Sequence, residues 1–522
     1  MPIDLDRNGS FVDEHDPDLQ DVFADLQGNI LNGHGRDQAV HVLVRFEPSP
    51  SSEESRRIRR WIARFASSRV TSAQAQFAAS EAFKSNGVDA GLFANFSLSA
   101  SGYAALGIEE RLRPLHPSPR QEDAGRPLPF GFGMADRRQE LMDSDEHFDR
   151  GYETRIDAMI LLAADNPADL IAVEVEVVGS LKEAGATVVA VERGFNLRRR
   201  FEDIDKVYGE PVEHFGYADG VSQPAFLKKQ FERERRNVGT KYWNPAAPLR
   251  LALVPDPAGQ PDVSFGSYLV FRKLEQDVRK FRRLERELAE KAGVSRKLAG
   301  AMAVGRFEDG TPLVLQPADS GRSFGEKSAV PNDFNYRGDG NGLACPFQAH
   351  VRKSNPRLES VGIFAGSRNV ELDHRIARRG IPYGGNLNLS ENPDELPERG
   401  VGLLFMCYQS DLFNQFEFIQ RFWCNNRNFL KPGPPDRRDD AGGNYDLTGL
   451  DPLIGQRLPG VVDPVLQASD PNEAPAEPPR NWPAGWGQRT VKVPDVDFTD
   501  VVRLKGGEYF FAPSLTFLRE LG

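Results

Sequence analysis

Apolar and polar residues alternate with two different periods along this chain, and the period changes several times. Residues 39–46, AVHVLVRF, alternate as in a half-buried strand. Residues 51–68 open with serines and acids and then carry apolar residues at helical spacing, which is typical of a capped helix. Residues 157–194 have the pattern of a strand, a helix and a second strand. This order predicts antiparallel strands covered by helices on one face, an α+β fold rather than a strict βαβ alternation.

The second half of the chain repeats this pattern. Residues 264–293 have the pattern of a strand followed by a long charged helix, whose outer face we expect to be solvated. Residues 401–423 and 506–521 again combine a strand pattern with a helix pattern. We therefore expect two ferredoxin-like lobes, each an antiparallel sheet covered by helices.

The lobes give the following expected domain organisation. Residues 1–25 are polar and are expected to form a mobile N-terminal arm. The first lobe is expected over residues 26–215 and the second over residues 216–522. Segments 431–445 and 468–488 lack a regular pattern, and their length is typical of functional loops or insertions in the second lobe.

Composition and charge exclude several classes of function. The 522 residues contain 76 acidic and 65 basic side chains, and the formal charge of −11 argues against nonspecific nucleic-acid binding. The charges are well mixed, and no run approaches the roughly 18 apolar residues of a membrane span. The three cysteines (Cys345, Cys407 and Cys424) show no CxxC spacing, and the acidic N-terminus has no apolar signal segment. We therefore expect a cytoplasmic protein that binds neither nucleic acid nor membrane.

Residues 343–384 hold the first candidate site. His350 follows an apolar stretch of small residues and precedes Arg352. A histidine in apolar surroundings suits haem iron, and nearby cations can neutralise the haem propionates. A core histidine bonded to a backbone carbonyl is the alternative. Further along, Arg378 lies in a basic run that Gly380-Ile381-Pro382 closes.

The second candidate site is the stretch of residues 213–224, EHFGYADGVSQP. Gly216 and Gly220 bracket Asp219, so the backbone can turn tightly and bring the carboxylate close to a ligand. Such a spacing alone is common in ordinary turns. Together with other segments, however, this stretch resembles the dye-decolorising peroxidases in sequence and in order. The other segments are those of His350 and Arg378, residues 27–31 (QGNIL) and residues 507–513 (GEYFFAP).

The resemblance implies a haem peroxidase that reduces hydrogen peroxide and oxidises dyes, phenols or other small aromatic reductants. Haem b would lie in the C-terminal lobe with His350 as its proximal iron ligand, and Arg352 would contribute to cofactor binding. Asp219 would move the proton of bound peroxide, and Arg378 would stabilise the charge that develops as the O–O bond breaks. An aspartate with an ordinary pKa of about 3.9 stays a base in acid, so an acidic optimum is expected. The alternative is a haem-handling protein with incidental peroxidase activity.

The resemblance also implies supporting residues. Asp451 would accept the second N–H of His350, with Glu417 as the weaker candidate. Leu403 and Phe405 share one face of a strand and would line the distal pocket. Trp423, Trp243 and Tyr383 are possible electron relays, a choice that the sequence leaves open, and a homodimer is possible. His214 and His374 flank these segments and could be mistaken for ligands. His374 is expected to face solvent or lie near the haem edge, and the sequence does not place His214. Gly380 stands where short bacterial members have asparagine, which favours the longer, fungal-type branch.

Overall fold

The computed structural model describes most of the chain, and every structural statement below refers to this part: residues 3–6, 10–47, 53–111, 129–200, 209–256, 258–320, 330–363, 368–426, 429–430, 449–456, 482–488 and 495–522. The expected loop 431–445 lies outside the described residues. Of the expected loop 468–488, only residues 482–488 are described, and there Trp482 is buried in a core cluster.

Four antiparallel strands form the N-terminal half of the sheet, in the spatial order β2, β3, β1, β4. Their bounds are β1 (Gln38–Arg45), β2 (Phe93–Leu98), β3 (Ala158–Ala164) and β4 (Thr187–Phe195). Helix α2 (Glu53–Ser68) buries Ile58, Trp61, Ile62 and Phe65, which the 3.6-residue period places on one face. The first strand, the helix after it and the strand–helix–strand unit are therefore confirmed.

The C-terminal half repeats this arrangement with the spatial order β12, β8, β11, β10. Its strands are β7 (Val254–Pro255), β8 (Phe265–Gln276), β9 (Ala377–Arg378), β10 (Ile381–Tyr383), β11 (Gly402–Gln409) and β12 (Val502–Ala512). The two halves also meet edge to edge, through Phe511 opposite Leu98 and through Tyr383 opposite Gly194. All these strands thus belong to one ten-stranded sheet, while β5 (Leu197–Arg199) and β6 (Glu210–Val212) form a separate pair.

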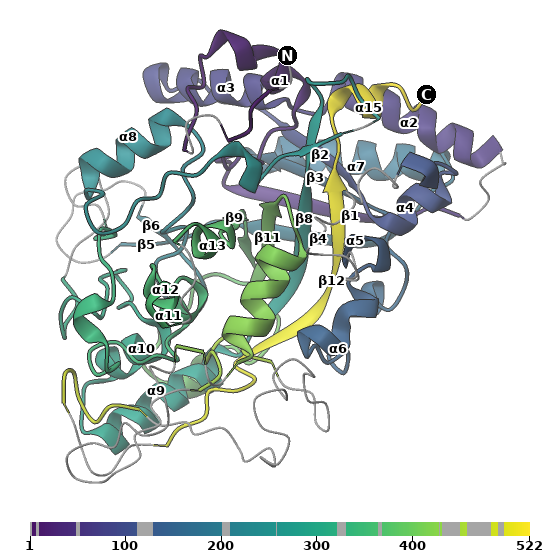
Figure 1. Ribbon diagram of the computed structural model, residues 1–522. Helices are drawn as coiled ribbons and strands as arrows, with labels where there is room; N and C mark the ends of the chain where they lie inside the picture. The colour runs from purple at the N-terminus through teal and green to yellow at the C-terminus, as the bar shows by residue number, and fades with distance from the viewer. Residues whose placement is uncertain are drawn as a thin grey trace, which may run out of the picture.

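Helices cover both halves, as Figure 1 shows. The helices around the N-terminal half are α1 (Gln20–Asp25), α2, α3 (Ala73–Asn86), α4 (Ala100–Ala105), α5 (Pro129–Phe132), α6 (Arg138–Leu141) and α7 (Pro167–Glu183), joined by α15 (Leu515–Arg519) from the C-terminus. The remaining helices are α8 (Lys228–Asn237), α9 (Val278–Ala292), α10 (Arg296–Val304), α11 (His350–Ser354), α12 (Glu359–Ile363) and α13 (Arg368–Asp373). The helix expected after β11 is wound as a π-helix over Phe413–Glu417 and Ile419–Cys424, a rare form that is common at functional sites.

The expectation of a mobile arm over residues 1–25 is wrong for its second half. Leu19, Val22, Phe23 and Leu26 are at most 1% exposed and belong to a core cluster that includes residues of both halves. Their helical spacing is interrupted by acidic residues, which concealed the apolar face in the sequence. The division at residues 215 and 216 stays a prediction, since the sheet and two core clusters run through both halves.

Candidate active site

A cavity of about 280 Å³ lies in the C-terminal half, and the segments singled out in the sequence meet around it. The hairpin after β6 contributes Asp219, α11 contributes His350, and β9 contributes Arg378. Strand β11 and the π-helix supply mostly apolar and aromatic walls. The sequence patterns therefore identified residues that the tertiary structure brings together, although Asp219 precedes His350 and Arg378 by more than 100 positions.

His350 is the first residue of α11 and lines the cavity with a ring that is 26% exposed. Its Nδ1 lies 2.8 Å from a carboxylate oxygen of Asp451. A carboxylate accepts hydrogen bonds only, so this contact places the imidazole proton on Nδ1 and leaves the lone pair on Nε2. A histidine in this tautomer has one nitrogen ready for a metal, which is the arrangement of a proximal ligand.

Asp451 is held firmly for this contact. Its side chain is fully buried, and its second oxygen accepts the backbone N–H groups of Leu453 at 2.9 Å and Ile454 at 3.0 Å. Burial works against the charge, but His350 and these hydrogen bonds outweigh it and hold the pKa of Asp451 below its usual value. The expected pairing of His350 with Asp451 is confirmed. Glu417, the weaker candidate, instead bonds to Arg137 and Tyr509.

Asp219 and Arg378 lie next to each other at the cavity. Arg378 Nη1 is 3.9 Å from Asp219 Oδ1, and the two side chains are 35% and 31% exposed. Arg378 also donates to the carbonyl of Val221 in the segment that follows Asp219. Gly216 and Gly220 have φ values of 95° and 77°, a left-handed conformation that glycine adopts without strain. The expected tight turn is confirmed, and it brings Asp219 next to Arg378.

Leu403 and Phe405 line the cavity from β11, as expected from strand alternation. Leu404 and Met406 point to the other side and belong to the core. In the antiparallel ladder, Phe405 lies opposite Arg272 of β8. One face of these two strands therefore forms an apolar wall with a single cation set into it.

Arg352 does not line the cavity, so its expected role in cofactor binding is wrong. It is fully buried, donates to Asp339 at 2.8 Å and pairs with Glu359. Its guanidinium lies between the rings of Phe347 and Tyr336, 4.4 Å and 4.6 Å from their centroids. Residues two positions apart on a helix face different directions, so α11 points Arg352 away from His350.

The cations that do line the cavity include Arg272, Arg306 and Arg375, which the sequence reading did not identify. Arg272 is 3% exposed and pairs with the buried Asp143, but its Nη1 is buried without a hydrogen-bond partner among the described residues. A buried guanidinium with an unsatisfied N–H is costly unless an anionic or polar group approaches it. Alternation along β8 places Arg272 on the same face as Leu274 and Gln276, a signal that could have identified it.

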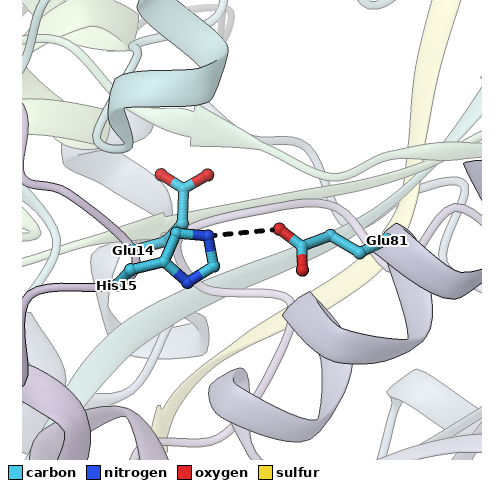
Figure 2. A group of neighbouring side chains, drawn as sticks. All are labelled: Glu14, His15 and Glu81. Atoms are coloured by element: carbon cyan, nitrogen blue, oxygen red, sulfur yellow. Dashed lines mark ion pairs between the residues drawn. The ribbon is translucent and has the colours of Figure 1, made fainter. Parts of the chain in front are cut away.

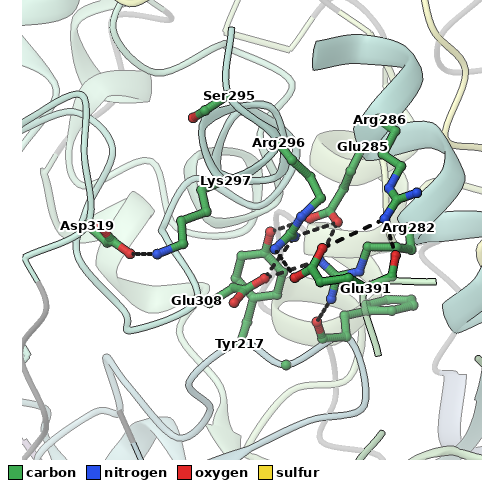
Figure 3. A network of polar contacts seen from close by, with 12 residues as sticks. Tyr217, Arg282, Glu285, Arg286, Ser295, Arg296, Lys297, Glu308, Asp319 and Glu391 are labelled. Carbon is green, nitrogen blue, oxygen red and sulfur yellow. Dashed lines mark hydrogen bonds and ion pairs between the residues drawn. The ribbon is translucent and has the colours of Figure 1, made fainter. Parts of the chain in front are cut away.

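Tyr217 also lines the cavity, and a network of ion pairs lies behind it (Figure 3). Its hydroxyl donates to Glu285, a fully buried carboxylate of α9, at 2.8 Å. Arg282 and Arg296 approach Glu285 at 2.6 Å and 3.3 Å, and both also reach Glu308. Desolvation raises the pKa of Tyr217, so the phenol stays protonated. This network fixes α9 and α10 against the cavity.

The two histidines near the candidate segments make their own contacts. His214 Nε2 bonds to the carbonyl of Tyr383 at 2.8 Å, and His374 Nδ1 bonds to the carbonyl of Asn414. The His374 ring stacks on Phe418 with centroids 3.7 Å apart and lines the cavity beside Trp423. Trp243 lines the cavity as well, while a relay role for it, for Trp423 or for Tyr383 stays a prediction.

A second group of possible metal ligands lies elsewhere. Glu14, His15 and Glu81 bring one ligand atom each within 4.8 Å of one another. Figure 2 shows the three side chains side by side. The ammonium of Lys229 is 3.4 Å from Glu14 and 4.0 Å from Glu81, and His15 is 3.4 Å from Glu81. A lysine already supplies the positive charge here, so this group is a surface ion-pair cluster.

The residues around the cavity fit a haem. His350 offers one imidazole nitrogen with its tautomer fixed, and the walls are largely apolar and aromatic. Arg272 offers a buried N–H without a partner among the described residues, which suits a carboxylate such as a propionate. Asp219 and Arg378 supply an acid–base group and a cation on the same cavity.

Comparisons with known proteins agree with this geometry. The family model "Dyp-type peroxidase, C-terminal" matches residues 237–430. The chain is 37% identical to the "Multifunctional dye peroxidase DyP2" of an Amycolatopsis species over the full length of both proteins. It is 30% identical to a "Dye-decolorizing peroxidase" of Mycena epipterygia, over 81% of this chain and 74% of the relative. The crystal structure of a DyP-type peroxidase of Anabaena sp. has a TM-score of 0.80 at 37% identity, covering 98% of this chain and 97% of that one.

Proposed function

The chain belongs to the family of dye-decolorising peroxidases and is a haem-dependent peroxidase, and on this premise we propose which residues carry out its reaction. Haem b, when bound, supplies the iron at which hydrogen peroxide is reduced and from which oxidising equivalents pass to dyes, phenols or other aromatic reductants. The haem would occupy the cavity of the C-terminal half.

His350 is proposed as the iron ligand, through Nε2. The contact of its Nδ1 with Asp451 supports this role, since the carboxylate fixes the tautomer and makes the imidazole a stronger electron donor. Asp451 acts through His350 and is a positioning residue. Its two backbone hydrogen bonds restrain the carboxylate, so the orientation of the imidazole is set before any cofactor enters.

Asp219 is proposed as the base that accepts the proton of hydrogen peroxide and returns it to the departing oxygen atom. Arg378 is proposed to stabilise the negative charge on that oxygen as the O–O bond breaks. Their separation of 3.9 Å supports a shared task, because both groups reach the same part of the cavity. Leu403 and Phe405 would exclude water from the peroxide.

The observation that carries this proposal is that the His350–Asp451 pair and the Asp219–Arg378 pair line one cavity. The test is Asp219→Asn. We expect haem binding to persist and the rate of reaction with hydrogen peroxide to fall about 10²- to 10⁴-fold, the usual contribution of a general acid–base group.

Asp373→Asn is a matched control, because Asp373 also pairs with an arginine, Arg250 at 2.6 Å, but does not line the cavity. It is expected to leave the peroxide rate unchanged. A haem-loaded Asp219→Asn variant that reacts with peroxide as fast as the unmodified protein would contradict the proposal. That outcome would favour a haem-handling protein, which needs His350 and has no use for Asp219.

We further propose a cytoplasmic location and a possible homodimer. The three cysteines are all buried and unpaired, as is usual in a reducing compartment. In the described part of the chain, no helix combines the length and the apolar character that crossing a membrane requires. Fractionation of cells that produce the native chain tests the location, and analytical ultracentrifugation tests the dimer.

A further inference from the structure

Glu213 is a second carboxylate on the cavity, and the reaction proposed above does not use it. It lines the cavity at the start of the hairpin that leads to Asp219. Its carboxylate accepts the backbone N–H of Phe215 at 2.8 Å and of Tyr217 at 3.0 Å. The side-chain amide of Gln276, from β8, donates to it as well. Glu213 thus closes the turn over residues 213–217 with its own side chain.

This turn determines where Asp219 lies. Glu213 N–H donates to the carbonyl of Tyr217 at 3.1 Å, and Gly216 N–H donates to the carbonyl of Glu213 at 2.8 Å. On the returning side, Asp219 N–H donates to the carbonyl of Pro211 at 3.1 Å. Asp219 is therefore anchored to a two-stranded hairpin whose closed end depends on the Glu213 carboxylate.

The charge on Glu213 is finely balanced. Desolvation raises its pKa to about 7, the hydrogen bonds from Gln276, Phe215 and Tyr217 oppose this rise, and the nearby charge of Asp219 adds to it. The carboxyl group therefore changes charge near neutral pH, in the same cavity as the proposed base.

The other charged groups near the turn contact its backbone. Arg199 donates to the carbonyl of Gly216, Arg282 donates to that of Phe215, and both arginines pair with Glu308. The neighbouring His214 points its Nε2 at the Tyr383 carbonyl. These arginines have their own carboxylate partner, so the charge of Glu213 is left to act on Asp219.

Gln276 can serve either state of Glu213. Its Nε2 donates to the ionised carboxylate, while its Oε1 is buried without a partner among the described residues. Turning the amide by half a rotation presents Oε1 instead, and a protonated Glu213 can then donate to it. In protonated Glu213 the carbonyl oxygen Oε1 still accepts the N–H of Tyr217, and the hydroxyl oxygen Oε2 keeps a lone pair for the N–H of Phe215, so the turn stays closed in both states.

We propose that Glu213 is a positioning residue for Asp219, and that loss of its proton adds a second negative charge to the cavity and slows the reaction with peroxide. The proposal rests on the proposed function, in which Asp219 is the base and negative charge develops on the peroxide oxygen. When Glu213 is neutral, Arg378 stabilises the charge on the peroxide oxygen without opposition, whereas an ionised Glu213 repels that charge.

The experiment is the rate of reaction of the haem-loaded protein with hydrogen peroxide, followed by stopped-flow absorption from acidic to alkaline pH. The unmodified protein should lose about tenfold in rate as pH rises past neutral, the effect of one pKa unit of coupling. Glu213→Gln keeps one oxygen for one of the two backbone N–H groups and carries no charge, so it should keep its rate on the alkaline side. An alkaline decline of the same size and midpoint in this variant would overturn the inference.

Glu508→Gln is the matched control. Glu508 also accepts two backbone N–H groups, from Met134 and Tyr509, and desolvation raises its pKa to about 7 as well, but it does not line the cavity. Its replacement is expected to leave the alkaline decline in place. A loss of the decline in this variant too would show that general stability, rather than Glu213, causes it.

A second variant keeps the test decisive if Glu213→Gln does not fold. Gln276→Leu removes the donor that lowers the pKa of Glu213, so the alkaline decline should move to higher pH. An unmoved decline would contradict the inference. Infrared spectroscopy of the haem-free protein gives an independent readout. Glu508 also contributes a protonated carboxylic acid band at slightly acidic pH, so the readout is the difference spectrum between the unmodified protein and Glu213→Gln, which should show a band that disappears on alkalisation.

The two proposals fail in different ways. If Asp219→Asn leaves the peroxide reaction intact, the proposed function is wrong whatever Glu213 does. If Asp219 is essential but Glu213→Gln keeps the alkaline decline, only the role of Glu213 is wrong.

Discussion

Replacing Asp451 with asparagine tests the hydrogen bond behind the proposed iron ligand. Asp451 uses one oxygen for His350 and the other for two backbone N–H groups. An asparagine keeps those backbone contacts only by turning its oxygen toward them, and its NH₂ group then faces His350 Nδ1. Two donors would meet, unless the imidazole moves its proton to Nε2 and so blocks the nitrogen that should bind iron.

The expected magnitude follows from the contact that is lost. A hydrogen bond to a charged group contributes about 1.5–3 kcal/mol. For a one-electron couple, about 1.4 kcal/mol is a tenfold change in the equilibrium constant and about 59 mV in the reduction potential. The lost hydrogen bond therefore predicts a rise of about 65–130 mV in the iron reduction potential. Haem affinity should fall about 10- to 100-fold, as is common when the carboxylate behind a metal-binding histidine is removed. Spectroelectrochemical titration measures the potential, and absorption titration with haem measures the affinity.

Glu417→Gln is the matched control for this variant. Glu417 is also fully buried, but it bonds to Arg137 and Tyr509 and makes no contact with His350. We expect its replacement to lower the unfolding temperature while the reduction potential stays unchanged. The reasoning about Asp451 would be refuted if Asp451→Asn bound haem with unchanged affinity and potential, or if both variants shifted the potential equally.

Three further predictions follow from the described contacts. Arg352→Met should leave Asp339 and Glu359 without their buried cation and lower the free energy of unfolding by about 3–5 kcal/mol in denaturant titrations. The haem absorption spectrum at low temperature should stay unchanged, and an altered spectrum would contradict the position of Arg352 away from the cavity. Glu508 has a folded-state pKa of about 7, above its ordinary 4.5, so its stabilising contribution is fully present below the ordinary value and is lost as pH rises through 7. Thermal unfolding at pH 5 and pH 8 should show a loss of stability, to which Glu213 contributes as well, and this loss should be smaller in Glu508→Gln by at most about 3 kcal/mol. An identical loss in the variant would refute this. Phe405→Ala should open the cavity wall, so the ratio of the rate with cumene hydroperoxide to the rate with hydrogen peroxide should rise several-fold. An unchanged ratio in steady-state assays would show that this wall does not limit the access of peroxides.

The order and type of the main elements could be predicted from the sequence, because each has a strong local signal. Strand β1 is buried on both faces, and its run of valines and leucines identifies it as a strand. The helical spacing in α2 and the alternation in the first half of β11 depend on which face is buried, and the sheet and helix periods record this directly. The core segment around Leu19 and Phe23 was missed for the same reason, since acidic residues between its apolar positions weakened the pattern.

The candidate site was partly accessible from the sequence. His350, Asp219 and Arg378 were identified from short motifs, and the structure places all three on one cavity. Arg352 was misplaced, because its closeness to His350 in sequence says nothing about direction on a helix. Arg272 was not identified, because it lies in a strand far from any motif.

The sequence by itself determined the family and the two α+β halves, and it supplied the residues that we propose for the reaction, because these depend on local pattern and on motifs. Only the tertiary structure decided that Asp451, rather than Glu417, supports His350, and that Glu213 closes the turn that carries Asp219. Hydrogen-bond partners and charge states depend on distances across elements and on the water that burial removes. The order of residues gives neither these distances nor the loss of water, so only the folded chain determines the hydrogen-bond partners and charge states.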